Sequence, residues 1–153
     1  YPDVLTGIYN RRFFEEKIKN MEDEAGIAVI DLDDFKLHND TYGHSAGDAA
    51  LITTANIIKK YIRKTDILIR YGGDEFVILS KGYTDADAKN YISQIQTGIE
   101  NYNANSNHEY TLEASMGYTI VEPAPDLDIE EIIETADQEM YKMKKAKKAA
   151  RRD

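Results

Sequence analysis

The sequence predicts one α+β domain in which helices pack on a mainly antiparallel central sheet. Apolar strand patterns alternate with helical patterns along the chain, as in layered domains whose helices cover a sheet. Two of the strand patterns join directly at Gly72 and Gly73, which predicts a hairpin. The order of elements contains a β-α-β-β-α-β core of the ferredoxin-like type. We expect residues 1–153 to form this single domain, since the chain is long enough for one real core.

The first half of the chain supplies a helix, a strand and two further helices. Helical spacing predicts the first helix within residues 6–21, through Phe13, Phe14, Ile18 and Met21. A continuous apolar run at residues 26–33 predicts a buried strand that ends in acids. A short helix is expected after this strand. Apolar residues then return on one face through residues 46–64, which predicts a longer helix.

The second half is expected to contain the hairpin, a helix, a long strand and a final helix. Thr84 or Asp85 is placed to cap the helix that follows the hairpin. A loop with prolines separates the last strand from the last helix. These elements cover residues 66–80, 84–103, 110–122 and 128–148, with a polar loop at 103–109.

Charge is unevenly distributed along the chain. The net charge is -9, yet residues 142–152 hold 7 of the 19 basic residues, so residues 1–141 hold 12 basic against 27 acidic residues. An acidic body argues against nucleic acid as a partner, because general nucleic-acid binding relies on neutralising phosphates. The basic end is either a solvated helix end or a phosphate contact, and composition leaves both open.

No segment indicates a membrane span or an oxidising compartment. The absence of cysteine excludes disulfides and thiolate metal sites, and it suits a reducing cytosol. No apolar run approaches the roughly 18 residues needed to span a bilayer, and no signal peptide is visible. We therefore expect a cytoplasmic domain. Because the chain begins at Tyr1 without methionine, we expect it to be excised from a longer signalling protein, which could itself carry a membrane anchor.

Acids stand at the mouth of a core strand in the stretch "RYGGDEFVIL". Asp74 and Glu75 follow a glycine pair that lets backbone approach a ligand closely. In the expected sheet, Asp31 at the end of the first strand lies beside this turn. The three acids would supply the hard oxygen ligands that Mg²⁺ prefers. The alternative is a polar strand end with solvated or helix-capping acids, and we favour the metal.

The segment after the first strand holds candidate nucleotide contacts. Asn39 and Asp48 flank a Gly-His turn, and an amide with a carboxylate could read a guanine edge. A helix cap and an ordinary loop acid are the alternatives. Lys36 would either offset phosphate charge or lie on a solvated face. His44 is a hydrogen-bonded turn residue rather than a metal ligand. No nucleophile with a neighbouring base is evident, so hydrolase chemistry is weakly supported.

The chain resembles the GGDEF domain family, the diguanylate cyclase domain, over essentially its whole length. The similarity rests on five segments that occur in the family's order and spacing. A single pentapeptide could arise by chance, whereas five ordered segments are specific. The segments are "DVLTGIYNRRFF", "DLDDFKLHNDTYGHSAGD", "GGDEF", "SMG" and "ADQEMYKMKK".

The resemblance implies a fold akin to nucleotidyl cyclases and polymerase palms. It also implies the condensation of two GTP into cyclic di-GMP with release of two pyrophosphates. Asp31 and Asp74 would bind two Mg²⁺ ions, which Mn²⁺ could replace, with Glu75 assisting and the Leu32 carbonyl contributing. Asp74, Glu75 and Lys36 are thereby the expected catalytic residues. The metals would polarise the α-phosphate and help to deprotonate the attacking 3'-hydroxyl.

The same resemblance implies a set of substrate contacts. Asn39 and Asp48 would recognise guanine, and the remaining contacts would lie along the ribose and phosphates. One departure affects the phosphates: the last helix runs "KKAKKAARRD" where the family has a glycine and a polar residue, so Lys148 would replace the usual arginine as a point charge. His38 stands where an aliphatic residue is usual. The other implied contacts are Phe35, Lys36, His44, Gly72, Gly73, Lys144 and Lys148.

An R-x-x-D pair precedes the glycines. Arg63 and Asp66 stand at the spacing of the family's inhibitory site, where the product cyclic di-GMP binds away from the active site. An arginine fork and a carboxylate suit phosphate and guanine. The alternative is a surface ion pair. Arg70 would either join this site or pair with Asp3.

The implied reaction also sets the expected partners. Because one site holds one GTP and the product joins two, two copies should face each other in a transient antiparallel homodimer. An N-terminal sensory or receiver domain in the longer protein would raise the effective concentration of the two copies. The alternative function is a catalytically impaired GGDEF domain that serves as a GTP or cyclic di-GMP receptor or interaction module.

Overall fold

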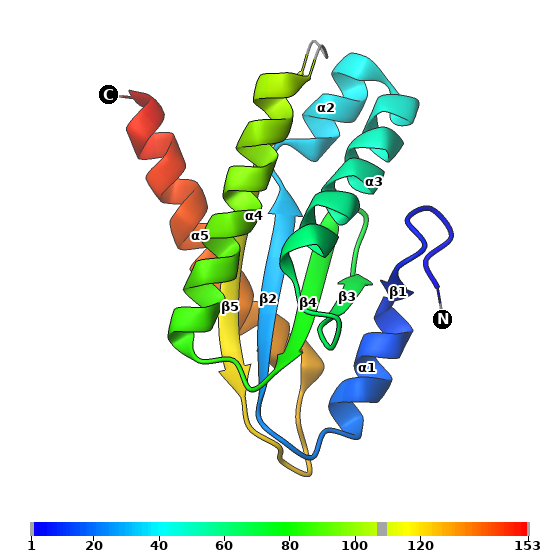
Figure 1. Cartoon of the computed structure of the whole chain (residues 1–153), viewed down its shortest axis with the longest axis vertical. Coiled ribbons are helices and arrows are strands. Elements are labelled where there is room, and N and C mark those ends of the chain that lie inside the picture. Colours follow the sequence, from blue (N-terminus) through cyan, green and yellow to red (C-terminus); the bar gives the residue numbers. More distant parts are fainter. Residues whose placement is uncertain (1, 107–109, 153) are drawn as a thin grey trace.

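The computed structural model of the protein describes residues 2–106 and 110–152. Within these residues, helices cover both faces of one sheet (Figure 1). The part of the predicted polar loop at residues 107–109 lies outside the described residues. The elements in chain order are β1 (Tyr9–Asn10), α1 (Arg11–Lys19), β2 (Ala25–Leu32), α2 (Phe35–Tyr42), α3 (His44–Tyr61), β3 (Ile67–Arg70), β4 (Glu75–Lys81), α4 (Asp85–Asn105), β5 (Ala114–Val121) and α5 (Ile129–Arg152).

The sheet has the strand order β1-β3-β4-β2-β5. Its centre is β2, which pairs antiparallel with both β4 and β5, while β3 pairs antiparallel with β4. These four strands and the helices between them form the predicted β-α-β-β-α-β core, so the expected fold class is confirmed. Only β1 pairs in parallel, with β3, which makes the whole sheet mixed.

The strand β1 was not predicted, because its two residues lie inside the range assigned to the first helix. The helix instead begins at Arg11. Asn10 caps it, since its side-chain oxygen accepts a hydrogen bond of 3.1 Å from the main-chain N–H of Phe13. A strand of two residues is too short to show an alternating hydrophobic pattern in the sequence. Its pairing with β3 in the structure identifies it.

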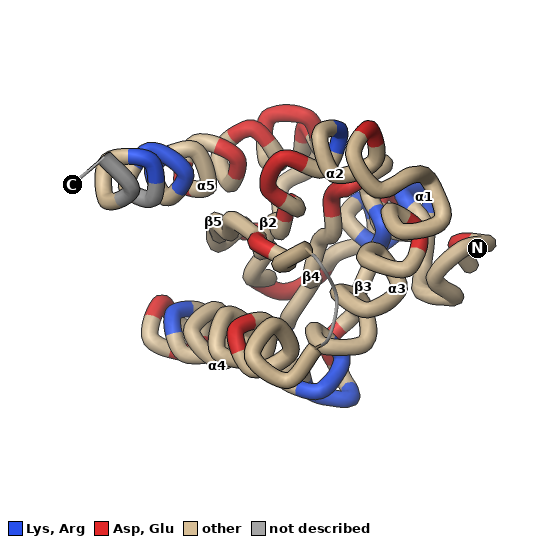
Figure 2. The backbone as a smooth tube through the Cα atoms, turned by 90° about the horizontal axis from the view of Figure 1, so that it is seen from above, with Lys and Arg blue, Asp and Glu red and all other residues tan. Residues whose placement is uncertain are grey.

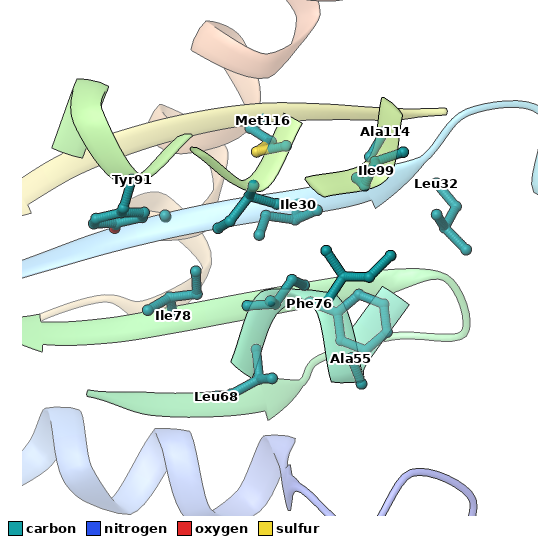
Figure 3. Close-up of a cluster of buried hydrophobic side chains, with 14 of the residues drawn as sticks. Ile30, Leu32, Ala55, Leu68, Phe76, Ile78, Tyr91, Ile99, Ala114 and Met116 are labelled. Atoms are coloured by element: carbon teal, nitrogen blue, oxygen red, sulfur yellow. The ribbon is translucent and has the colours of Figure 1, made fainter. Parts of the chain in front are cut away.

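Two hydrophobic layers hold the helices on the sheet. Successive residues of β2 point to opposite faces, so Ile30 packs under α3 and α4, and Val29 packs under α1 and α5. Figure 3 shows the first layer, where Phe76 and Ile78 of β4 lie near Ile30. Seen from above, α4 and α5 lie on opposite sides of the sheet (Figure 2).

Several element boundaries differ from the prediction. The helix α3 begins at His44, directly after Gly43, whose φ of 92° allows the sharp turn from α2. The helix α4 continues to Asn105, and β5 begins only at Ala114. Of the two predicted caps for α4, Thr84 is the N-cap, and it forms a capping box with Asp87. None of the described helices is long and apolar enough to cross a membrane.

Candidate functional site

The site is built where β2 ends and β4 begins. Asp31 and Glu75 are paired positions of the two antiparallel strands. The main-chain N–H of Leu32 donates a hydrogen bond of 3.1 Å to the main-chain carbonyl of Asp74. The hairpin therefore brings its acids to the acidic end of β2, and the proximity inferred from the topology is confirmed.

Asp31 is largely enclosed, with 16% of its side chain exposed. Its Oδ2 atom accepts a hydrogen bond of 2.7 Å from Nζ of Lys144 on α5. Its Oδ1 atom is buried and has no hydrogen-bond partner among the described residues. Burial raises the pKa of Asp31 to about 6, with the charge of Asp74 adding to the rise and Lys144 opposing it.

Glu75 shares this excess of negative charge. Burial raises the pKa of Glu75 to about 7, and the charges of Asp137, Asp31 and Asp74 raise it further, while Lys144 acts against them. The carboxyl groups thus resist ionising together. A cation placed among them would favour their charged forms.

Asp137 also belongs to this cluster, although it was not among the site residues predicted from the sequence. It lies on α5 seven residues before Lys144, which places both on one helix face. Burial raises the pKa of Asp137, and Lys144 lowers it. Its Oδ1 atom is also buried without a hydrogen-bond partner in the described part of the chain. The spacing of Asp137 and Lys144 was the signal that could have identified it.

The residues present suit a hard divalent cation. Carboxylate and carbonyl oxygens are the ligands that Mg²⁺ prefers, and the unpartnered Oδ1 atom of Asp31 is an acceptor that the described fold leaves unused. Across residues 2–106 and 110–152, no three His, Cys, Asp or Glu side chains converge as ligands of one ion. A cation here would therefore draw its other ligands from main chain, water or a bound phosphate.

The glycine turn has a tight main-chain geometry. The N–H groups of Tyr71 and Gly72 both donate to the Glu75 carbonyl, at 2.8 and 3.2 Å. Neither Gly72 nor Gly73 has a positive φ, and a Cβ at Gly73 would meet no atom within 4 Å. The described fold itself therefore gives no reason for glycine at position 73.

Asn39 and Asp48 come from two consecutive helices, α2 and α3. The Asn39 side chain lies against Gly47, the residue before Asp48. The Asn39 Oδ1 atom is buried and has no hydrogen-bond partner among the described residues, whereas Asp48 is exposed. The fold thus places the Asn39 amide against the residue that precedes Asp48.

The remaining predicted substrate contacts surround this region. Phe35 is partly buried against the core, while Lys36 and His44 are exposed. Lys148 is exposed one turn beyond Lys144 on α5, in the part of the helix where Lys and Arg gather (Figure 2). The side chain of Lys147, the departure from the family pattern, lies outside what the structure describes.

His38, the other departure, lies in an aromatic cluster. Its ring centroid is 4.4 Å from that of Tyr110 and 5.2 Å from that of Tyr42. Both ring nitrogens are buried without hydrogen-bond partners in the described part of the chain, and burial lowers the His38 pKa. An uncharged imidazole therefore packs here much as an aliphatic residue would.

Arg63 and Asp66 form a closed ion pair. Nη2 of Arg63 lies 3.0 Å from Oδ1 of Asp66, and the main-chain N–H of Arg63 donates to Oδ2 at 2.7 Å. The hydroxyl of Tyr83 donates to the same Oδ2 at 3.1 Å. The Asp66 side chain is fully buried, while the Arg63 side chain is 47% exposed. The guanidinium alone therefore offers a surface to a ligand.

Arg70 is not close to Arg63. Arg63 donates to the carbonyl of Lys81 at one end of the hairpin, and Arg70 donates to the carbonyl of Gly73 at the other, at 2.9 Å. Arg70 also pairs with Asp3 at 3.3 Å. Of the two alternatives left open by the sequence, the structure shows the pair with Asp3, which ties the N-terminal segment to the hairpin.

Comparison with known proteins agrees with this arrangement. The family described as "Diguanylate cyclase, GGDEF domain" matches residues 1–150. The chain is 32% identical to the "Probable diguanylate cyclase DgcC" of Escherichia coli K12, over 94% of this chain but only 40% of that protein. The chain therefore spans less than half the length of this curated relative.

The chain is also similar to solved structures of GGDEF domains and diguanylate cyclases. Diguanylate cyclase SiaD of Pseudomonas aeruginosa, solved with its activator SiaC, matches with a TM-score of 0.83 at 26% identity, over 95% of this chain and 58% of that one. A microbial GGDEF domain studied with cyclic di-GMP matches with a TM-score of 0.73 at 27% identity, over 95% and 93% of the two chains. With its five motifs, its palm-like sheet and its acidic strand ends, the chain belongs to the GGDEF domain family of diguanylate cyclases.

Proposed function

We propose that this domain condenses two GTP into cyclic di-GMP with release of two pyrophosphates, and that it requires Mg²⁺. The observation that carries the proposal is the acidic cluster of Asp31, Asp74 and Glu75 at paired strand ends. Membership of the diguanylate cyclase family supports the choice of reaction. Because GTP is a cytoplasmic nucleotide, we also propose a cytoplasmic location.

Asp31, Asp74, Glu75 and the carbonyl of Leu32 would hold two Mg²⁺ ions, which Mn²⁺ could replace. When bound, these ions polarise the α-phosphate and lower the pKa of the attacking 3'-hydroxyl. The chain's own acids would position the ions, and a nearby cation would favour the charged forms of Asp31 and Glu75, whose pKa values burial raises.

The nucleotide would lie between the acidic cluster and α2. Asn39 and Asp48 would bind the guanine edge, where an amide and a carboxylate together match its donors and acceptor. The absence of side chains at Gly72 and Gly73 would admit the phosphates close to the main chain. The flanking contacts to base, ribose and phosphates would come from Phe35, Lys36, His44, Lys144 and Lys148.

Lys144 would have two partners in this scheme. In the structure its Nζ atom binds Asp31, and for the terminal phosphates of GTP it would turn toward the nucleotide. Lys36 is exposed on the first turn of α2 and would offset phosphate charge during the reaction. Both roles require only an ammonium group, which a flexible lysine can deliver.

Catalysis would need two copies of the domain. One site binds one GTP, so each 3'-hydroxyl must meet the α-phosphate held by the other copy, which requires an isologous antiparallel dimer. We propose that this dimer is transient for the isolated domain. An N-terminal sensory or receiver domain in the longer protein would raise the effective concentration of the copies.

Product inhibition through Arg63 and Asp66 is a further part of the proposal. The guanidinium of the half-exposed Arg63 side chain would contact a phosphate or guanine of cyclic di-GMP, and buried Asp66 would hold the arginine in place. Arg70 binds Asp3 and Gly73 at the other end of the hairpin and is not included in this site. A relative of the same family has been studied with cyclic di-GMP, which supports product binding as a family property.

The direct test is to incubate the purified protein with GTP and Mg²⁺ and to quantify cyclic di-GMP by chromatography. Product should form, ATP should give none, and specific activity should fall as the protein is diluted through the micromolar range. Constant specific activity on dilution would contradict the dimer. Absence of product at every protein concentration, together with tight cyclic di-GMP binding, would favour the alternative of a receptor whose altered α5 end has impaired catalysis.

A further inference from the structure

Gly47 lies where a side chain would collide with Asn39. The residue is buried in the first turn of α3. A Cβ built on Gly47 would overlap the Asn39 Oδ1 atom and would lie 2.8 Å from Asn39 Cγ and 3.3 Å from Nδ2. All three nearest atoms belong to this one amide group, so the space that a side chain would fill is occupied by Asn39.

The main chain does not itself require glycine at this position. The described glycines with positive φ are Gly7, Gly43 and Gly82, so Gly47 has a backbone that any residue could adopt. Glycine inside a helix lowers stability relative to alanine, because it loses more backbone freedom on folding. The choice of glycine is therefore unfavourable for the helix and must have its reason in a contact.

We propose that Gly47 is a positioning residue for guanine recognition, because its missing side chain creates the recess that holds the Asn39 amide beside Asp48. This inference rests on the proposed function, which assigns Asn39 and Asp48 to guanine. It adds that guanine specificity depends on the close approach of α2 to α3 at Gly47. A larger residue there would push the amide out of the reach of the base.

The surroundings of Asn39 explain why displacement would be easy. Its Oδ1 atom accepts no hydrogen bond from the described residues, so no protein donor holds the amide where it is. The Asn39 main-chain carbonyl accepts from the N–H of Gly43 at 2.8 Å, which fixes the backbone only. A methyl group at position 47 would therefore rotate the side chain of Asn39 and leave both helices in place.

The test compares Gly47→Ala, Asn39→Ala, the double variant and Gly98→Ala. Gly98 on α4 is a matched control, because a Cβ there would also be crowded, 2.6 Å from Cε2 of Tyr61, the last residue of α3 and far from Asn39 in the chain. Binding is measured by calorimetry with Mg²⁺ and 3'-deoxy-GTP, which lacks the attacking hydroxyl, and in parallel with 3'-deoxy-ATP. A second readout is the NMR signal of the Asn39 side-chain amide without nucleotide, assigned by its loss in Asn39→Ala.

Gly47→Ala should weaken 3'-deoxy-GTP binding about tenfold or more, the scale expected when a polar base contact is lost, and should change 3'-deoxy-ATP binding little. In the Asn39→Ala background, Gly47→Ala should weaken 3'-deoxy-GTP binding little further. The Asn39 amide signal should shift in Gly47→Ala and stay in place in Gly98→Ala. If Gly47→Ala is too unstable to purify, the double variant should regain stability because the crowded side chain is gone.

Distinct results would overturn the inference and the proposed function. If Gly47→Ala keeps the preference for guanine, the role of Gly47 is wrong, while the proposed function stands. The same follows if Gly47→Ala weakens 3'-deoxy-GTP binding equally in the parent and in the Asn39→Ala background. Where Gly47→Ala proves unstable, a double variant that stays equally unstable would also overturn the role of Gly47. A parent protein that binds both deoxynucleotides equally would overturn the proposed function itself.

Discussion

Lys144 on α5 and Asp31 at the end of β2 form an ion pair, with 2.7 Å between Nζ and Oδ2, although 113 positions separate them in the chain. Burial acts to lower the pKa of Lys144, but the hydrogen bond and charge of Asp31 raise it, with further help from Asp33 and Asp74. The last helix is thereby attached to the acidic strand ends. The Lys144 ammonium group acts to lower the pKa values of Asp31, Glu75 and Asp137.

Lys144→Met should destabilise the metal-free protein. Breaking a buried ion pair costs about 3–5 kcal/mol, and because Lys144 is 32% exposed water should reduce the loss to about 1–2 kcal/mol. Urea denaturation in EDTA would measure it. Lys142→Met is the matched control, since Lys142 forms an exposed pair with Glu139 on the same helix and should change stability little. Equal effects of the two variants would contradict a special role for the pair.

Asp74→Ala should abolish cyclic di-GMP formation without unfolding the domain. The main-chain carbonyl of Asp74, which accepts from Leu32, remains in the alanine variant, so the strand ends keep their contact. The loss of a metal ligand should also weaken Mn²⁺ binding, which titration calorimetry would measure. Exposed Asp23 provides the control variant Asp23→Ala. Unaltered turnover in Asp74→Ala would reject the proposed metal site.

The raised pKa values predict an unusual pH dependence for the metal-free protein. The pKa of Glu75 is about 7 in the fold, above its ordinary value, so between these two values the folded state binds more protons than the unfolded state. Stability from this group is therefore present at pH 4.5 and is lost as the pH rises through 7. Asp31, with a pKa of about 6, acts in the same direction.

Thermal denaturation in EDTA at pH 5.0 and pH 7.5 would test this dependence. The loss of stability toward pH 7.5 should be smaller in Glu75→Gln, which cannot ionise, than in the parent protein. Saturating Mg²⁺ should reduce the loss in the parent as well, because a cation favours the charged carboxylates. Identical pH profiles of parent and variant would show that Glu75 ionises normally.

Asp48→Ala should reduce the affinity for GTP and relax the preference over ATP. The carboxylate accepts from guanine N–H groups that adenine does not present together, and losing such a contact costs about 1–3 kcal/mol. Because Asp48 is exposed, stability should be nearly unchanged. Competition binding with both nucleotides is the measurement, with Asp126→Ala as an exposed control. Equal competition by ATP in the parent would remove Asp48 from guanine recognition.

Arg63→Ala should retain catalysis and raise the concentration of cyclic di-GMP needed for inhibition. The variant should also lose stability, because the fully buried Asp66 side chain loses the guanidinium and keeps only the Tyr83 hydroxyl and a main-chain N–H. Inhibition curves and urea denaturation would measure the two effects, with neighbouring Lys64→Ala as control. If the parent binds no cyclic di-GMP at micromolar concentrations, only the stability effect should remain, and the pair is structural.

The sequence by itself determined the family, the order of the helices and of the strands β2 to β5, and the meeting of Asp31 with the hairpin acids. These features depend on local information: hydrophobic period, turn residues and motif spacing are set by neighbours within a few positions. The ferredoxin-like order of the four long strands then follows, because few topologies connect such elements without crossing. The local patterns and this strand order together place the acidic end of β2 beside the turn at Gly72.

Only the tertiary structure decided the contacts between distant elements. The pairing of β1 with β3, the ion pair of Arg70 with Asp3, and that of Lys144 with Asp31 all join segments remote in the chain. The recess at Gly47 depends on the angle at which α2 meets α3, and a helical glycine carries no sign of it in its local pattern. Such contacts are set by how whole helices and strands pack against one another, so no window of a few residues contains them.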